Sequence, residues 1–276
     1  MFQYLRERTS GFAFVETYLT GAISRDEFRS RVEANADDLE AAGLSRFEIK
    51  KLSMFPPDRR VCAAGMLEAM ASAGLADDPA PRDAEFDAFL AEMDKRFRHL
   101  DHRRTYIFPD ETRGAFEFSM ALHPKNVVVC GAYYNYLAVW LVPGLAPGGR
   151  MLCLDIDGSV SEAGRANMQR LGFTDGVETV CRDAEEALLK GNDPIDLLVL
   201  DATGPQMHPD PRYHGKSIYG PLLAAARPRM GSGAWVLAHN ADQGSPLLSE
   251  FYAGVADATF THYLGTTDDL AVFRLP

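Results

Sequence analysis

The sequence contains few cysteines, few basic residues and no long apolar run. Its 276 residues include four cysteines, and no two of them form a Cys-x-x-Cys pair. A cysteine metal cluster or a disulfide framework is therefore not expected. Cys130 and Cys153 lie inside apolar runs, as reduced and buried thiols of a cytoplasmic protein do. Because no apolar run has the length of a membrane span or the core of a signal peptide, we expect a cytoplasmic protein without a membrane partner.

Basic residues are outnumbered by acidic ones, 28 against 39, and the formal net charge is −11. A protein that binds nucleic acid needs a basic face for the phosphate backbone, so nucleic acid is not expected as a partner. A small cationic ligand remains compatible with this charge.

Residues 1–107 show helical signals and no alternation typical of strands. The segment Ser24-Arg-Asp-Glu27 is typical of a capping box and opens a charged stretch that reaches about Ala42. Further helices are expected at Arg46–Met54, Asp58–Ala73 and Asp83–His102, with a loop rich in Pro and Asp at 74–82. We expect a helical N-terminal domain that either serves as a structural cap or forms a lid over a substrate pocket.

Residues 108–276 alternate short apolar runs with helical segments. β-Branched and apolar runs are typical of strands buried on both faces of a parallel sheet. Five such strands are expected, at Val127–Cys130, Met151–Ile156, Val177–Cys181, Ile195–Leu200 and Ala234–Ala238. Helices are expected at Tyr136–Val142, Ser159–Leu171, Ala184–Lys190 and Ile218–Arg227, and a closing hairpin at 259–264 and 270–274. The alternation predicts an α/β fold with a doubly wound sheet, which binds ligands at the carboxyl ends of its strands.

Chemically informative residues follow the first three expected strands. Gly131 permits a tight turn and a close approach of backbone to ligand. Asp155 can accept both ribose hydroxyls of a nucleoside, and Asp183 with Ala184 can contact the edge of an adenine. Either acid could instead cap the following helix, although Asp157 suits that role better than Asp155. The glycine fingerprint G-x-G-x-x-G is absent, which disfavours a nicotinamide dehydrogenase.

The order of these segments resembles a known family. The glycine loop, LDID at 154–157, RDA at 182–184, DLLVLDA at 196–202 and GSGAWVLAHN at 231–240 follow one another as in class I S-adenosylmethionine (SAM)-dependent methyltransferases. The resemblance covers residues 126–240 and is nearest to the catechol O-methyltransferase type. It implies a Rossmann-like domain at 108–276 with a seven-stranded, mostly parallel sheet, and SAM as the cofactor. The implied cofactor-binding residues are Gly131, Ala132, Tyr133, Tyr134, Asn135, Asp155, Ile156, Asp183, Ala184 and Asp201.

The first loop departs from the family, which has small residues and glycines there. Tyr133, Tyr134 and Tyr136 crowd this loop, and Asn135 stands in the place of a glycine. Aromatic faces attract a sulfonium cation by roughly 0.5–2 kcal/mol each, so Tyr133 and Tyr134 could hold the sulfur of SAM. The alternative is that some rings pack in the core, Tyr136 first among them.

The metal site of the family is also altered. Metal-dependent members bind Mg²⁺ through an acid after the fourth strand and an Asp-Asn pair after the fifth. Asp201 matches the acid, but the pair is His239-Asn240, and the family's lysine shortly after the aspartate is missing. Because Mg²⁺ prefers oxygen ligands, no metal is expected, with a softer ion at Asp201, His239 and Asn240 as the alternative. His239 could then be a general base or a strand-end histidine with satisfied hydrogen bonds.

The leading hypothesis is a methyltransferase that acts on a small molecule by S_N2 displacement, with Tyr134, Asp201 and His239 as catalytic candidates. A second hypothesis is a SAM cyclase that forms azetidine-2-carboxylate and methylthioadenosine. A third is a non-catalytic SAM-binding protein. The polar loop Thr203–Ser217 is expected either to recognise the substrate or to be solvated. The oligomeric state stays open, with exchange of the helical extension between subunits as one route to a homo-oligomer.

Overall fold

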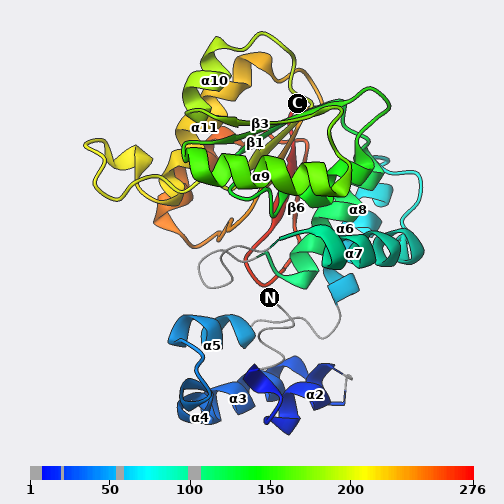
Figure 1. Ribbon diagram of the computed structural model, residues 1–276, viewed down its shortest axis with the longest axis vertical. Helices are drawn as coiled ribbons and strands as arrows, with labels where there is room; N and C mark the ends of the chain where they lie inside the picture. The colour runs from blue at the N-terminus through cyan, green and yellow to red at the C-terminus, as the bar shows by residue number, and fades with distance from the viewer. Residues whose placement is uncertain (1–7, 20–21, 54–58, 99–106) are drawn as a thin grey trace.

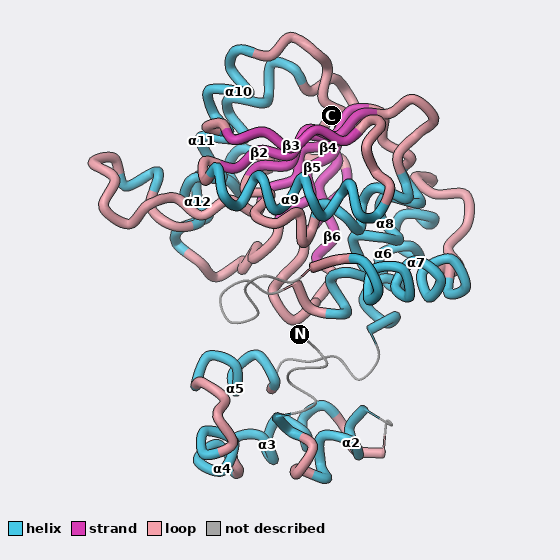
Figure 2. The backbone as a smooth tube through the Cα atoms, viewed as in Figure 1, coloured by secondary structure: helices cyan, strands magenta, loops and turns pink. Residues whose placement is uncertain are grey.

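The computed structural model describes residues 8–19, 22–53, 59–98 and 107–276 (Figure 1). A central sheet carries helices on both faces, and a group of N-terminal helices lies beyond one end of it (Figure 2). None of the helices in these ranges is long and apolar enough to cross a membrane.

The sheet has seven strands in the order β3-β2-β1-β4-β5-β7-β6. Strands β1 to β5 are parallel to one another, whereas β7 runs antiparallel to both β5 and β6. The strands are β1 (Asn126–Cys130), β2 (Arg150–Asp155), β3 (Val177–Cys181), β4 (Leu197–Leu200), β5 (Trp235–Ala238), β6 (Phe260–Tyr263) and β7 (Ala271–Arg274). The expected Rossmann-like α/β class is therefore confirmed. The closing hairpin is present, and its second strand is the one that joins the rest of the sheet.

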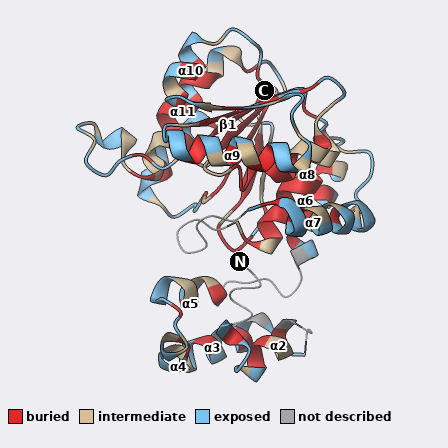
Figure 3. Cartoon of the chain, in the orientation of Figure 1, coloured by how far each residue is buried: buried red, intermediate tan, exposed pale blue. Residues whose placement is uncertain are grey.

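Successive residues of the parallel strands enter two different apolar cores. Val127 and Val129 of β1 point to one face, while Val128 and Cys130 point to the other. The first face is covered by α8 (Pro109–Leu122), the 3₁₀ helix η1 (Ala138–Gly144) and α9 (Gly158–Leu171). The second face is covered by α10 (Ala184–Lys190), α11 (Tyr219–Ala226) and α12 (Ser249–Gly254). Because both of their faces are buried, the central strands β4 and β5 are apolar throughout rather than alternating, whereas the edge strand β3 carries exposed residues (Figure 3).

The N-terminal helices belong to two different cores. A separate apolar cluster forms among α2 (Ala13–Leu19), α3 (Arg25–Ala34), α4 (Ala36–Ala41) and α5 (Arg46–Leu52), and Phe108 joins it. By contrast, α6 (Arg59–Ser72) and α7 (Asp83–Arg96) place Met66, Phe86 and Met93 in the core on the α8 face of the sheet. The helical character expected for this region is present, and its described residues contain no strand. The domain boundary at 107/108 stays a prediction, because the apolar contacts group α6 and α7 with the sheet.

Several helix ends follow the local sequence signals. Ser24 accepts the N–H of Glu27 at the start of α3, as its capping sequence predicts. Ser45 and Glu48 form a reciprocal capping box at the start of α5. Gly172, at φ 84°, closes α9 in the left-handed conformation, which costs glycine little.

Other helices differ from expectation. The charged stretch after Ser24 breaks at Asn35 into α3 and α4. The segment after β1 forms the 3₁₀ helix η1 rather than an α-helix at Tyr136–Val142, and it contains Pro143, which supplies no N–H. The long helix expected at Asp83–His102 ends at Arg96, and residues 99–102 lie outside the described residues. Helices α8 and α12 were not expected. Short 3₁₀ turns lie at Pro211–Tyr213, Lys216–Ile218, Arg227–Arg229 and Pro246–Leu248.

A glycine pair tests the packing between α8 and η1. A Cβ on Gly144 of η1 would overlap the backbone of Ser119 in α8, whereas a Cβ on Gly65 within α6 would meet nothing. We expect Gly144→Ala to lower the free energy of unfolding by about 1–3 kcal/mol through overpacking. Gly65→Ala should raise it by about 0.5–1 kcal/mol, because alanine loses less backbone entropy in a helix. Urea unfolding measures both, and equal effects would contradict the packing.

Candidate functional site

The carboxyl ends of the parallel strands bring the sequence-predicted residues to one edge of the sheet. Register pairs Cys130 of β1 with Leu154 of β2, and Asp155 of β2 with Cys181 of β3. The residues that follow these strands are therefore neighbours. Gly131, Asp155 and Asp183 lie on the β1–β3 side of the edge, and Asp201 and His239 lie on the β4–β5 side.

Gly131 makes a turn that a larger residue could not make. Its φ is 80°, and a Cβ there would overlap the backbone of Ala202, which follows β4. Position 131 therefore requires glycine, because the backbone of Ala202 leaves no room for a Cβ. The N–H groups of Gly131 and Ala132 both donate to the carbonyl of Leu154 at 2.9 Å, which fixes the loop against the end of β2.

Asp155 ties the same loop to the start of α9. One carboxylate oxygen accepts the N–H of Tyr133 at 2.9 Å and the other accepts the N–H of Asp157 at 3.0 Å. A carboxylate offers about four acceptor positions, so each oxygen retains one for a ligand hydroxyl. The helix cap is a different residue: Asp157 accepts the N–H groups of Ser159 and Val160. Asp155 is therefore fixed by two backbone N–H groups and still has acceptor positions for a ligand.

The residues next to Asp155 on this side of the edge are exposed. Ile156 is 70% exposed, although it is apolar. Asp183 is exposed and caps α10, where its carboxylate accepts the N–H of Glu186 at 2.8 Å. The capping alternative for Asp183 is thus present, and an adenine contact by Asp183 and Ala184 stays a prediction.

The aromatic loop divides into buried and half-buried residues. Tyr136 is buried in the core beside Phe97, with ring centroids 5.5 Å apart, as anticipated for this ring. Tyr133 and Tyr134 are half-buried, and their ring centroids lie 4.2 Å apart. Tyr133 has a φ of 49°, a conformation unusual for a large residue. These two rings therefore remain the candidates for contact with a ligand.

Asn135 requires a correction. Its φ of 64° agrees with its standing in the place of a glycine. Its side chain, however, is fully buried and donates to the hydroxyl of Thr179 on β3 at 2.9 Å. The amide therefore points into the interior rather than toward a ligand, which argues against the cofactor contact expected of this side chain.

Asp201 lies between two nitrogen groups on the β4–β5 side. Its Oδ1 accepts from the ammonium of Lys216 at 3.1 Å and lies 2.9 Å from Nδ1 of His239. The same ammonium donates to the hydroxyl of Tyr219, which donates to the carbonyl of His239 at 2.7 Å. Burial acts to raise the pKa of Asp201, but the charges of His239 and Lys216 outweigh it and lower the pKa. Asp201 is therefore an ionised carboxylate whose Oδ1 is shared by Lys216 and His239.

His239 lies between two carboxylates and is almost wholly buried. Its Nδ1 faces Asp201, and its Nε2 lies 3.2 Å from Oε2 of Glu111 on α8. Burial acts to lower the pKa of His239, but Asp201 and Glu111 outweigh it and raise the pKa to about 9. The imidazole is thus charged at neutral pH in this state. The expected role as a general base requires a neutral ring, so the geometry argues against it.

Glu111 connects this cluster to the loop between β6 and β7. Its two oxygens accept the N–H of Phe108 at 2.8 Å and the N–H of Asp268 at 2.7 Å. Beside it, Asp110 accepts the N–H and hydroxyl of Thr267. Burial and the charge of Glu111 raise the pKa of Asp110 to about 7.

The N-terminal helices reach the cluster through Lys51 of α5. Its ammonium forms an ion pair with the side chain of Asp268. Burial is the main cause of a lowered pKa for Lys51. The carboxyl edge of the sheet is thus linked by charge to a helix that lies in a separate apolar core.

The loop Thr203–Ser217 is largely held by its own contacts. Gly204 and Gly215 form a bridge at its base, and the hydroxyl of Tyr213 donates to Glu185 of α10 at 2.8 Å. His208 and Arg212 both contact Asp210 within the loop. Between these contacts Met207 is 93% exposed. A role in substrate recognition stays a prediction.

The residues at the family's metal position do not fit Mg²⁺. A Mg²⁺ ion prefers oxygen ligands and retains several waters. Here the acid after β4 is bonded to the ammonium of Lys216 and faces a ring nitrogen of His239. The local sequence lacks the family's lysine shortly after Asp201, yet the fold brings Lys216 to that carboxylate from the far end of the loop. No magnesium chemistry is therefore assigned to Asp201, His239 and Asn240.

Sequence reasoning missed three members of this cluster, Lys51, Glu111 and Asp268, and it placed Lys216 near the site only as part of the polar loop Thr203–Ser217. A helix start at Phe108-Pro-Asp-Glu111 could have been recognised from Pro at the first position and Glu at the third. No local pattern, however, relates Glu111 to Asp268 or to His239, because the three lie far apart in sequence and meet only through the sheet.

Lys216 offers a test of the cluster. We expect Lys216→Met to lower the free energy of unfolding by about 1.5–3 kcal/mol, because a charged hydrogen-bond donor to the buried Asp201 is lost. The matched control is Lys190→Met, whose exposed pair with Glu186 lies four residues apart on α10 and is worth less than about 0.5 kcal/mol. Urea unfolding compares the two, and similar losses would argue against a structural role for Lys216.

Comparisons with known proteins were made for the whole chain. No protein-family model matches it. A segment of 84 residues, 30% of the chain, is 34% identical to a catechol O-methyltransferase of Mycobacterium tuberculosis (strain ATCC 25618 / H37Rv). That segment spans 38% of the length of the curated relative.

Three solved structures share the fold at low identity. The O-methyltransferase TomG from Streptomyces achromogenes, in complex with SAM, aligns with a TM-score of 0.50 at 18% identity over 76% of this chain and 96% of its own. Cofactor-bound Rv0187 from M. tuberculosis aligns with a TM-score of 0.50 at 19% identity, over 72% and 99%. The Podospora anserina methyltransferase PaMTH1, bound to S-adenosylhomocysteine (SAH), aligns with a TM-score of 0.50 at 15% identity, over 71% and 97%. The chain therefore has the fold of the class I SAM-dependent methyltransferases, as the resemblance of its sequence implied.

Proposed function

We propose that this protein binds SAM at the carboxyl edge of its sheet and transfers the methyl group to an oxygen of a small molecule. The observation that carries the proposal is Asp155. Its carboxylate lies at the end of β2, is oriented by two backbone N–H groups and retains acceptor capacity for ribose hydroxyls. The structural neighbours bound to SAM or SAH support this assignment.

The β1–β3 side of the edge offers a binding position for each part of SAM. Asp155 would bind the ribose, and the exposed Ile156 would cover one face of the adenine. Asp183 and Ala184 at the start of α10 would flank the adenine edge. Tyr133 and Tyr134 would lie near the sulfonium, which aromatic faces attract. The proposed catalytic role of Tyr134 is to hold the sulfonium at this position.

Positioning would account for most of the rate in such a transfer. The acceptor oxygen attacks the methyl carbon in line with the sulfur, the new C–O bond forms as the C–S bond breaks, and SAH leaves. On the β4–β5 side, the ammonium of Lys216 is about four-fifths buried and lies beside Asp201. The acceptor oxygen loses its proton to solvent before it attacks, because Lys216 is paired with Asp201 and is not a free base. His239 is charged and paired with Asp201 and Glu111, so it would not act as a base either.

A product assay tests the reaction. The purified protein is incubated with SAM alone and with a panel of phenolic and catecholic acceptors, and the nucleoside product is identified. We expect SAH that appears only when an acceptor is present. Methylthioadenosine from SAM alone would replace the proposal by the cyclase. SAM binding without either product would replace it by the non-catalytic binding protein.

Asp155 provides the test of the cofactor site. We expect Asp155→Ala to abolish measurable SAM binding by calorimetry, because the ribose loses its acceptor and the Tyr133 loop loses its anchor. The matched control is Asp157→Asn, two residues on, which should keep near-normal affinity because Asn caps a helix as well as Asp does. Thermal melting of both variants checks the fold. Near-normal affinity of a folded Asp155→Ala protein would overturn the ribose assignment.

A further inference from the structure

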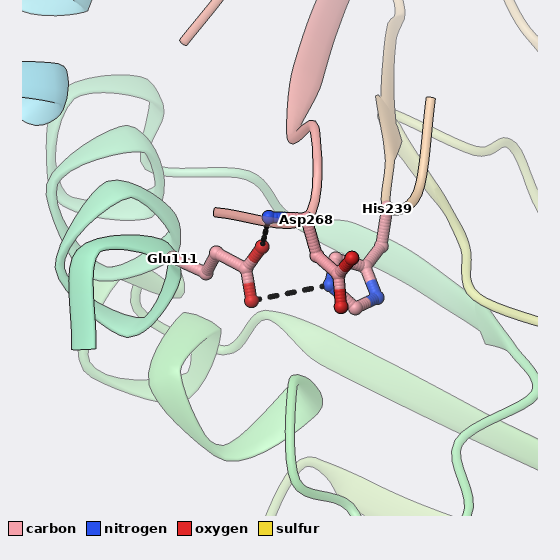
Figure 4. A group of neighbouring side chains, drawn as sticks. All are labelled: Glu111, His239 and Asp268. Atoms are coloured by element: carbon pink, nitrogen blue, oxygen red, sulfur yellow. Dashed lines mark hydrogen bonds and ion pairs between the residues drawn. The ribbon is translucent and has the colours of Figure 1, made fainter. Parts of the chain in front are cut away.

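Glu111, His239 and Asp268 form a compact group of potential metal ligands that no sequence motif connects. One ligand atom from each lies within 4.8 Å of the other two, and all three residues are buried. They come from α8, from the end of β5 and from the loop between β6 and β7, and Figure 4 shows their side chains converging on one place. The group is therefore built by the tertiary fold.

The imidazole of His239 is oriented toward this group. Its Nδ1 lies 2.9 Å from a carboxylate oxygen of Asp201 on one side of the ring. Its Nε2 is buried and has no hydrogen-bond partner. Glu111 lies within ion-pair distance of Nε2 at 3.2 Å, but the two atoms do not meet the angles of a hydrogen bond. Nε2 of His239 thus faces two carboxylates and is held beside Glu111 by an ion pair rather than by a hydrogen bond.

The two carboxylates are held by the backbone. Glu111 accepts the N–H groups of Phe108 and Asp268, so its oxygens cannot rotate away from the group. Its side chain is fully buried, and that of Asp268 is 10% exposed. Ligands that are fixed before binding lose little entropy when an ion arrives, which favours binding.

A cation already occupies part of this place. The ammonium of Lys51 forms an ion pair with Asp268, and its side chain is 13% exposed. This lysine belongs to α5, whose apolar core is separate from those of the sheet. The site therefore attracts positive charge, and its present occupant is a side chain that could withdraw without disturbing the sheet.

We propose that Glu111, His239 and Asp268 bind one divalent ion of the Zn²⁺ class, with Lys51 as the internal cation that takes its place when the ion is absent. One imidazole and two carboxylates are ligands that Zn²⁺ accepts, with a fourth position left for water. The proton on Nε2 of the charged His239 is released to solvent as the ion binds. The contact between Nδ1 of His239 and Asp201 is the carboxylate–histidine–metal arrangement that orients a histidine ligand. Mg²⁺ is disfavoured by the ring nitrogen.

This site differs from the position tested above with Asp201, His239 and Asn240. It uses the opposite ring nitrogen of His239, and its two carboxylates come from Glu111 and Asp268. Asp201 orients the histidine and is not a ligand, and it keeps its bond to Lys216. The proposal does not depend on the proposed methyl transfer, because it concerns binding of an ion.

Direct titration tests the site. The full-length protein, stripped with a chelator, is titrated with Zn²⁺ and with Mg²⁺ by calorimetry, and with Co²⁺ by visible absorption. We expect one Zn²⁺ per chain, no Mg²⁺ binding, and Co²⁺ bands typical of nitrogen and oxygen ligands. Asp268→Asn and Glu111→Gln should each weaken Zn²⁺ binding at least tenfold. Asp242→Asn, an exposed acid nearby in sequence, serves as the unaffected control.

Lys51 keeps the proposal testable if a ligand variant does not fold. Lys51→Met should tighten Zn²⁺ binding at least tenfold because a competing cation is removed, whereas Lys50→Met on the exposed side of α5 should change nothing. Cys181→Ser removes the exposed thiol and should leave the affinity unchanged. Binding that persists in folded Asp268→Asn, that is lost with Cys181, or that is insensitive to Lys51→Met would overturn the site, as would an absence of Zn²⁺ binding.

Discussion

The pairing of a buried, charged His239 with Asp201 and Glu111 is the interaction on which the arrangement of this molecule depends. Removing charges from water costs several kcal/mol per ion unless each one finds a partner. The three residues come from β5, from the end of β4 and from α8. The sheet and α8 must therefore pack in one relative orientation, because in any other orientation these charges would lack partners. Through Asp268 and Lys51 the same requirement extends to the loop after β6 and to α5.

This network divides the carboxyl edge of the sheet into two parts. On the β1–β3 side lie a half-buried pair of tyrosines and the carboxylate of Asp155, which accepts two backbone N–H groups. On the β4–β5 side, the strand ends are filled with paired charges, and Lys216 donates to the carboxylate of Asp201. Under the proposed function, the nucleoside of SAM would lie over the first part, next to the paired charges of the second.

Much of the fold followed from local patterns. Apolar runs located all five parallel strands to within one or two residues, because strands buried on both faces leave few other interpretations. The capping sequence that begins at Ser24 located the start of α3. The errors arose where tertiary contacts overrode local preference. Asn135 lies in a loop whose sequence indicates ligand binding, but its amide points inward and donates a hydrogen bond to Thr179. Helix α8 was not predicted because the charged residues of a buried ion pair, Arg113 and Glu117, interrupt its apolar face.

The sequence by itself determined the α/β class, the order of the strands along the chain and the acid at the end of β2. These follow from short-range hydrophobicity and turn chemistry, which act between residues close in the chain. Only the tertiary structure decided that His239 is a charged residue between two carboxylates, that a lysine at the end of a long loop reaches Asp201, and that Glu111, His239 and Asp268 converge. Electrostatic partners separated by dozens of residues are chosen by how elements pack, and no local pattern records that choice.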